Sequence, residues 1–284
     1  ADSKVDVKAK DEARVINVAV GVGGAANAAV QGASATTLIN KTTSAEIADT
    51  KIDEKGGTSA KVTVDAQNDS EITSSADVAA AAASGAGVGA GIAVNRIIQQ
   101  TNAAVNGGTM NVNNLTVNAN ATPQITNIGV GIGVAGSGAG VTGSVAVNMI
   151  KNDVTARIGS GATIVADGTV GVVATSDEQI ANYAGQASVA GSGAAVGLSV
   201  SYNELTGSTT ATIGDATSVS ASGKGDALKV KDTVGDENDD KILDDVVDKS
   251  TFDSQNTLGD DRVESEYKGV AVSASSTHAI KSFI

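Results

Sequence analysis

The stretch that decides the fold is VGIGVAGSGAGVTGSVAVN, residues 130–148, which is rich in glycine and carries no charge and no aromatic ring. Extended back to Ile128, it is long enough to be considered as a membrane-spanning helix. Its composition argues against a helix, because glycine is a poor helix former and β-branched valine favours extended chain. Val130, Ile132 and Val134 alternate with glycine, and a period of two indicates a strand. We therefore expect strands here and no membrane insertion of this segment.

Three glycines of this stretch, Gly138, Gly140 and Gly143, match the G-x-G-x-x-G spacing of dinucleotide-binding loops. Such a loop closes a strand, opens a helix and has an acidic residue about 20 positions further on. Asp167 lies too far along the chain, and the residues after Gly143 alternate like a strand. The stretch also recurs elsewhere in the chain, whereas a nucleotide loop is needed once. We therefore expect no cofactor at these glycines.

Two signatures alternate along the chain and divide it into four modules. The first is a Gly- and Ala-rich run in which an asparagine precedes an alanine by eight residues: Asn95 and Ala103, Asn148 and Ala156, Asn203 and Ala211, with Thr37 and Ala45 in these places in the first module. The second reads V-x-A, then five residues, then an aliphatic residue: Val7/Ala9/Val15, Val64/Ala66/Ile72, Val117/Ala119/Ile125, Val172/Ala174/Ile180 and Val272/Ala274/Ile280. The four alanines are 58, 53 and 55 residues apart, so the repeat unit has about 55 residues.

The composition indicates how such a repeat folds. Only 2% of the residues are aromatic, and Pro123 is the single proline. An interior without large rings is built from small side chains, which fill space only where backbones lie close together, as in a coiled sheet. Short segments such as VAVN and VTARIG are separated by Gly, Asp, Asn and Ser turn signals. We predict an all-β fold, a right-handed parallel β-helix of four modules, each with two or three rungs of about 18–27 residues.

One region, residues 224–269 in the last module, interrupts the repeat and carries its densest charge. Its apolar residues Ile242, Leu243, Val246 and Val247 would share one face of a short amphipathic helix over Asp239–Lys249. Acidic side chains make this insertion a candidate Ca²⁺ site, although Lys241 and Val247 break the EF-hand pattern. The candidate ligands are Asp236, Asn238, Asp239, Asp240, Asp260 and Asp261. A solvated acidic excursion without a metal is the simpler interpretation.

Residues that recur in the modules are interpreted as scaffold. Asn95, Asn148 and Asn203 are expected to form a stacked polar ladder along the solenoid, not a row of ligands. Ala103, Ala156 and Ala211 are expected to line its small-residue wall. His278, the only histidine, lies two residues before Ile280 at a position that varies between modules. We expect it in a surface turn, with neither a catalytic nor a metal-binding role, because triads and zinc sites need further partners.

Charge and cysteine content limit the classes of partner. The formal net charge is −13, and nucleic acid requires a basic face, so we expect no nucleic-acid partner. The acidic balance suits a soluble extracellular protein. The chain has no cysteine, which excludes a disulfide framework and a thiol-based site. Its first and last residues fall on the V-x-A signature, so we interpret residues 1–284 as one β-solenoid segment of a longer array.

The pattern VAGSGAGVTGSVAVN, followed in its module by VTARIG and ATIVA, resembles the repeats of very large filamentous adhesins secreted by Gram-negative bacteria. These are the haemagglutinin-like and leukotoxin-type passengers of the type V secretion systems. The resemblance covers nearly the whole chain apart from the insertion and lies in the scaffold, so no functional residue carries over. It implies a right-handed β-helical shaft at the cell surface, anchored in the outer membrane or released, that works without cofactors in adhesion and virulence.

We therefore expect a structural and adhesive protein, not an enzyme, that presents binding surfaces to a receptor or glycan on host cells or other bacteria. Two alternatives stay open. The first is a polysaccharide-degrading β-helix enzyme, a lyase or hydrolase, which would need a carboxylate cluster that the scattered acids of the modules do not suggest. The second is a trimeric autotransporter head, whose much shorter repeat differs from the period of about 55 residues seen here.

Overall fold

The computed structural model describes residues 4–53, 60–224, 227–232 and 263–284. Every helix or strand assigned in these ranges is a strand, so the predicted all-β fold is confirmed. No helix in the described part of the chain is long and apolar enough to cross a membrane. The helix predicted over Asp239–Lys249 lies outside the described residues.

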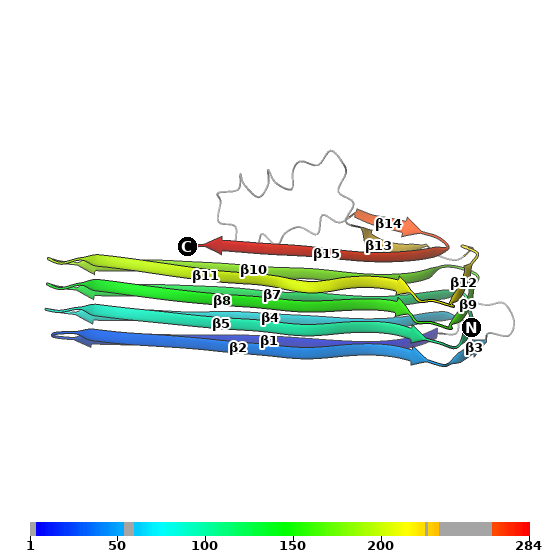
Figure 1. Ribbon diagram of the computed structural model, residues 1–284, viewed down its shortest axis with the longest axis horizontal. Helices are drawn as coiled ribbons and strands as arrows, with labels where there is room; N and C mark the ends of the chain where they lie inside the picture. The colour runs from blue at the N-terminus through cyan, green and yellow to red at the C-terminus, as the bar shows by residue number, and fades with distance from the viewer. Residues whose placement is uncertain (1–3, 54–59, 225–226, 233–262) are drawn as a thin grey trace.

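Each module contributes two long strands followed by a short one, and corresponding strands of successive modules lie side by side (Figure 1). The long strands have 19 to 22 residues. In chain order the strands of the four modules are β1 (Lys4–Ala25), β2 (Ala29–Ala48), β3 (Lys51–Asp53), β4 (Lys61–Ala82), β5 (Gly87–Asn106), β6 (Thr109–Val112), β7 (Asn114–Ala135), β8 (Gly140–Ile158), β9 (Thr163–Ala166), β10 (Val170–Ala190), β11 (Ala195–Ile213) and β12 (Ser218–Ala221). The chain continues with β13 (Leu228–Asp232), β14 (Val263–Tyr267) and β15 (Val270–Phe283).

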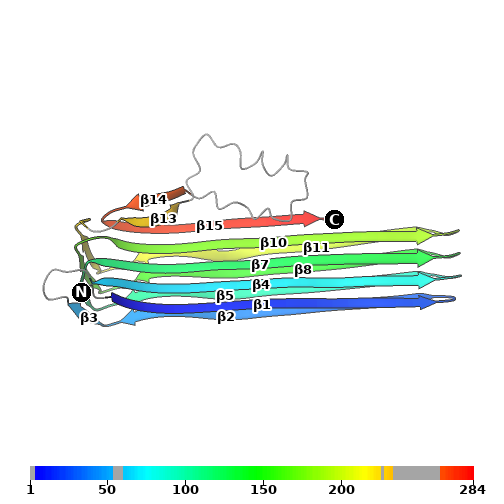
Figure 2. The same ribbon diagram turned by 180° about the vertical axis from the view of Figure 1, so that it is seen from behind.

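The modules stack as three parallel sheets. Sheet A has the order β1-β4-β7-β10-β15, sheet B the order β11-β8-β5-β2, and sheet C the order β12-β9-β6-β3. Sheets A and B run side by side along the long axis, and sheet C lies at the end near the N-terminus (Figure 2). We call this the proximal end, and the end where β1 turns into β2 the distal end. This stacking is that of a parallel β-helix.

One module makes one coil, so the prediction of two or three rungs per module is wrong. The segments VAVN and VTARIG, expected as separate strands, both belong to β8. The turn signals between them, Asn152 and Asp153, do not end the strand, because the Asn152 side chain is buried and its Nδ2 donates to Ser176 Oγ of β10 at 2.7 Å. Coils are about 4.8 Å apart, the spacing of paired strands, so each module adds about that length to the stack.

The sequence signatures mark the register between coils. All positions of the V-x-A signature and its aliphatic residue stack on their counterparts in sheet A. In sheet B, Ala45, Ala103, Ala156 and Ala211 pair in the same way. The repeat that is visible in the sequence is therefore the residue-to-residue pairing of the fold.

The apolar interior narrows from the proximal to the distal end. At the proximal end the three sheets enclose Val, Ile, Leu and Ala side chains, among them Ala103 and Ala156. A layer of isoleucines follows between sheets A and B: Ile39, Ile72, Ile97, Ile125, Ile150 and Ile180. Further out, the interior side chains shrink to alanines such as Ala35, Ala76 and Ala93.

The glycine-rich stretch 130–148 forms the distal wall, where the two sheets approach most closely. A Cβ on Gly140 of sheet B would lie 2.7 Å from the carbonyl oxygen of Val189 and 3.1 Å from that of Gly133, both in sheet A. No side chain fits at the position of Gly140. Along β7 the glycines are therefore buried, and Val130, Ile132 and Val134 point outward to solvent.

The described ends of the insertion form a hairpin, which the sequence did not predict. β13 pairs antiparallel with β14 on top of the stack near the proximal end (Figure 1). The side chain of Leu228 lies over Gly171 of β10, where an added Cβ would meet it. The two ends of the insertion are close, since a Cβ on Gly223 would be 3.4 Å from the backbone nitrogen of Gly269.

Because its ends meet, the insertion should be dispensable for the fold. We expect that deleting residues 225–268 and joining Lys224 to Gly269 leaves a β-rich protein whose melting temperature changes by no more than about 4 °C, as followed by circular dichroism. Leu228→Ala in the full chain is the matched control for the lost hairpin contact. Unfolding on deletion would show that the insertion braces the core. Calcium titration of both forms tests the Asp236–Asp261 candidates, whose binding the deletion should abolish.

Candidate functional site

The asparagines that recur in sheet B form the predicted polar ladder. Asn95, Asn148 and Asn203 lie in register, and the first two are fully buried. Asn95 Nδ2 donates to Asn148 Oδ1 at 2.9 Å, and Asn148 Nδ2 donates to Asn203 Oδ1 at 2.9 Å. Each amide therefore stabilises the amide of the next coil. In the first coil Thr37 takes this place and accepts a bond from Asn17 Nδ2 at 3.1 Å.

A second ladder in sheet A was missed in the sequence. Asn127 Nδ2 donates to Asn182 Oδ1 at 2.8 Å, and Asn182 Nδ2 donates across the interior to Ser201 Oγ at 2.8 Å. Asn17 and Ser74 occupy the same register position in the first two coils. The sequence does contain a pattern that predicts this ladder, because each of these polar residues follows the aliphatic residue of the V-x-A signature by two positions.

The candidate calcium ligands Asp236, Asn238, Asp239, Asp240, Asp260 and Asp261 all lie outside the described residues. Within the described ranges no group of three or more His, Asp or Glu side chains is placed to hold a metal ion. The calcium site of the insertion thus stays a prediction.

The expectation that His278 lies in a turn is wrong, although its side chain is half exposed, as expected of a surface residue. His278 is in strand β15 and pairs in register with Glu178 of β10, at a position that points into the solenoid. The alternation of β10 puts Gln179 outward and Glu178 inward. The Glu178 side chain is 1% exposed and that of His278 is 51% exposed.

These two residues belong to a cluster of interior polar side chains. His278 Nε2 lies 3.4 Å from Glu178 Oε2 and 3.0 Å from Ser276 Oγ. Beneath them Ser176 Oγ donates to Glu178 Oε1 at 2.9 Å and accepts from Asn152 Nδ2 at 2.7 Å. A Ser-His-acid triad requires the serine and the acid on opposite ring nitrogens. Here both contact Nε2, so the cluster does not have the geometry of that relay.

Burial controls the titration of this cluster. Removal of the carboxylate from water raises the pKa of Glu178 above its ordinary value of 4.5. The hydrogen bond from Ser176 and the charge of His278 oppose this rise but do not cancel it. The folded protein therefore holds the Glu178 proton more tightly than the unfolded chain does.

The raised pKa predicts a pH-dependent stability. The contribution of Glu178 is fully present below about pH 4.5 and is lost as the pH rises through the folded pKa. We expect Glu178→Gln to raise the free energy of unfolding at pH 8 by about 1 kcal/mol, because it removes a buried charge whose Oε2 has no hydrogen bond. The gain should vanish near pH 4.

Chemical denaturation from pH 4 to pH 8 measures this difference. Glu204→Gln is the control, since Glu204 lies on the outer side of β11, where Tyr202 Oη donates to it at 2.9 Å. A loss of stability in Glu178→Gln at pH 8 would contradict the raised pKa of Glu178, because it would show that the fold stabilises the carboxylate.

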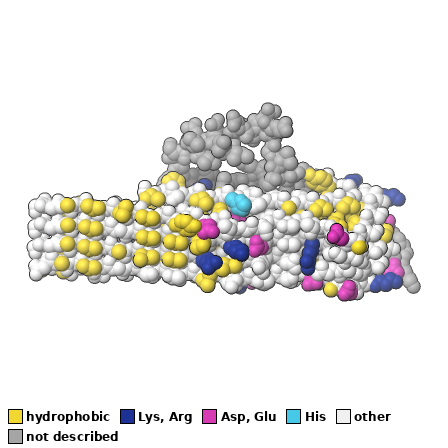
Figure 3. Space-filling view, in the orientation of Figure 1, with side chains coloured by type: hydrophobic (Ala, Val, Ile, Leu, Met, Phe, Trp, Pro, Cys, Tyr) yellow, Lys and Arg dark blue, Asp and Glu magenta, His cyan; other side chains and the backbone are white. Residues whose placement is uncertain are grey.

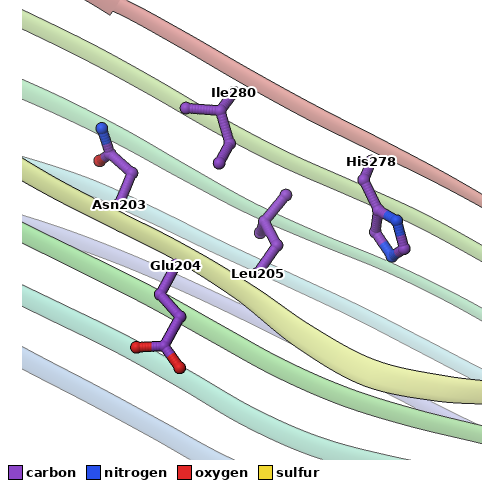
Figure 4. Close-up of a pocket in the computed structure, with 5 residues that line it drawn as sticks. All are labelled: Asn203, Glu204, Leu205, His278 and Ile280. Atoms are coloured by element: carbon purple, nitrogen blue, oxygen red, sulfur yellow. The ribbon is translucent and has the colours of Figure 1, made fainter.

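The cluster borders a hollow of about 540 Å³ at the top of the stack, lined by Asn203, Glu204, Leu205, His278 and Ile280. Figure 4 shows that these side chains come from two strands, β11 and β15. In the described residues β15 extends sheet A by a fifth strand, while sheet B has four. The hollow lies beside β15 and opens onto the inner side of the solenoid at β11. A strand paired to β11 would cover it.

No family model matches the chain, and neither a characterised protein nor a solved structure is significantly similar to it.

Proposed function

We propose that the chain is a structural and adhesive segment of a filamentous protein displayed on, or released from, a bacterial cell surface. The observation that carries the proposal is the unbroken register of four coils, in which buried amide hydrogen bonds join the second, third and fourth coils. Such stacking makes a stiff body that repeats its surface at every coil. The resemblance of its repeat to haemagglutinin-like and leukotoxin-type passengers supports the same role.

The length of the strands suggests how such a segment would work. A strand of about 20 residues spans about 65 Å, whereas a coil adds only about 4.8 Å along the axis. Each module therefore adds about 300 Å² to each of two flat faces. We infer a broad blade whose contact area grows with the number of coils. A receptor or glycan on host cells or other bacteria would bind to these faces, with no nucleic acid and no cofactor involved.

Bead adhesion tests this function. Beads that carry the purified protein should be retained on epithelial monolayers or bacterial lawns at several times the level of albumin-coated beads. Beads carrying the Ala156→Asp variant, whose fold we expect to be disrupted, are the matched control, and a glycan array then identifies the ligand class. Retention no higher than that of albumin on every surface would refute the proposal. Release of unsaturated or reducing sugars from acidic polysaccharides would support the enzyme alternative instead.

A further inference from the structure

The distal half of sheet B carries an apolar outer face. Its outward side chains stack in four columns. Figure 3 shows the hydrophobic side chains of these columns in yellow, one above another, over this half. From the distal end the columns are Val30/Val88/Val141/Val196, Gly32/Ala90/Gly143/Leu198, Ser34/Ile92/Val145/Val200 and Thr36/Val94/Val147/Tyr202. We call these sixteen residues the distal face. Several are strongly exposed, for example Val30 at 71% and Leu198 at 64%.

The distal face contains no charged residue, although the chain has a net charge of −13. Charges begin only in the next column, with Arg96 and Glu204. Two such faces can therefore meet without opposing like charges, which would otherwise disfavour contact between two acidic chains.

The fold itself cannot bury this face. The interior beneath it is already filled by small side chains such as Thr142 and Ser144, and a Cβ on Gly87 would lie 2.5 Å from the carbonyl oxygen of Val134. The apolar side chains of the distal half thus point outward and can be removed from water only by an external partner.

We propose that a second copy of this chain packs on the distal face, sheet against sheet. Four columns about 6.6 Å apart on four strands about 4.8 Å apart cover about 500 Å² per copy, or about 1,000 Å² for a pair. This area lies at the lower limit of specific interfaces, so the expected association is weak and reversible. This proposed association between two copies does not depend on whether the chain also binds a receptor.

The surface shape of the distal face suits a second copy of the chain. Gly32, Ala90 and Gly143 leave a low column across β2, β5 and β8, between two columns of larger side chains, and Leu198 of β11 closes one end of it. A second copy presents the same ridges and furrows at the same strand spacing, so ridges can enter furrows in the manner of paired sheets. A lipid surface fits less well, because β2 and β11, the outermost strands of sheet B in the described residues, border the face with unpaired backbone groups.

Sedimentation equilibrium over a concentration series tests the proposal on the whole chain. The parent should show a reversible rise in mass with concentration that does not weaken at high salt. The double variant Val145→Lys/Val200→Lys places charges on two adjacent strands of the face, β8 and β11, and should raise the dissociation constant at least tenfold. The matched control Thr155→Lys/Thr210→Lys puts the same charges outward on the same two strands in the proximal half and should leave it unchanged.

Circular dichroism first checks that the variants fold, and Val145→Thr/Val200→Thr replaces the lysine pair if it does not. Three outcomes would overturn the proposal: a parent that stays monomeric throughout, variants and control that weaken association equally, or a monomeric parent that binds phosphatidylcholine vesicles through Val145 and Val200. The last result would assign the face to membranes.

Discussion

Ala156→Asp should abolish most of the stability of the solenoid. Ala156 is fully buried in the proximal core, in register with Ala103 and Ala211. A carboxylate there either remains charged without a partner or takes up a proton. Protonation at pH 7 of a group with an ordinary pKa near 3.9 costs about 4 kcal/mol, before any cost of the added volume. This is a large part of the stability of a typical domain.

Thermal melting followed by circular dichroism measures the effect. We expect a melting temperature lower by at least about 10 °C at pH 7, and a smaller loss at pH 4. Thr155→Asp is the control, because Thr155 is the neighbouring residue on the outward side of β8. A variant that melts within a few degrees of the parent would contradict the inward placement of Ala156.

Gly140→Val should be nearly as damaging, for a steric reason. The carbonyl oxygens of Val189 and Gly133 lie 2.7 Å and 3.1 Å from the position of the added Cβ, and both are backbone atoms that cannot turn aside. The sheets would have to separate over the distal half. We expect a loss of at least about 3 kcal/mol in the free energy of unfolding by chemical denaturation.

Gly143→Val is its matched control in the same strand. Gly143 points outward, and the nearest atom to its added Cβ is the carbonyl oxygen of Leu198 at 3.8 Å. Valine favours a strand more than glycine does, so this variant should be neutral or slightly more stable. Equal losses in both variants would mean that the distal sheets are not in close contact.

The repeat, its length of about 55 residues and its β character can all be predicted from the amino-acid sequence. The sequence also identified Asn95, Asn148 and Asn203 as a ladder and Ala156 as part of the wall. These features could be predicted because stacked parallel coils place equivalent residues on one another, so each structural contact between coils leaves a matching residue in the sequence.

The tertiary structure alone decided the size of the coil and the direction of the side chains. The turn signals Asn152 and Asp153 predict a boundary between short strands, yet both lie within β8, where the buried Asn152 amide donates to Ser176 of β10. His278 and Glu178 point inward because pairing fixes the alternation of β15 and β10. Val130 and Ile132 are apolar but lie outside, since the inward positions beside them face Thr142 of sheet B, and a Cβ on Gly133 would lie 2.8 Å from Thr142 Cγ2. Hydrophobic periodicity shows that two faces alternate, but only the packing of the sheets determines which face is buried.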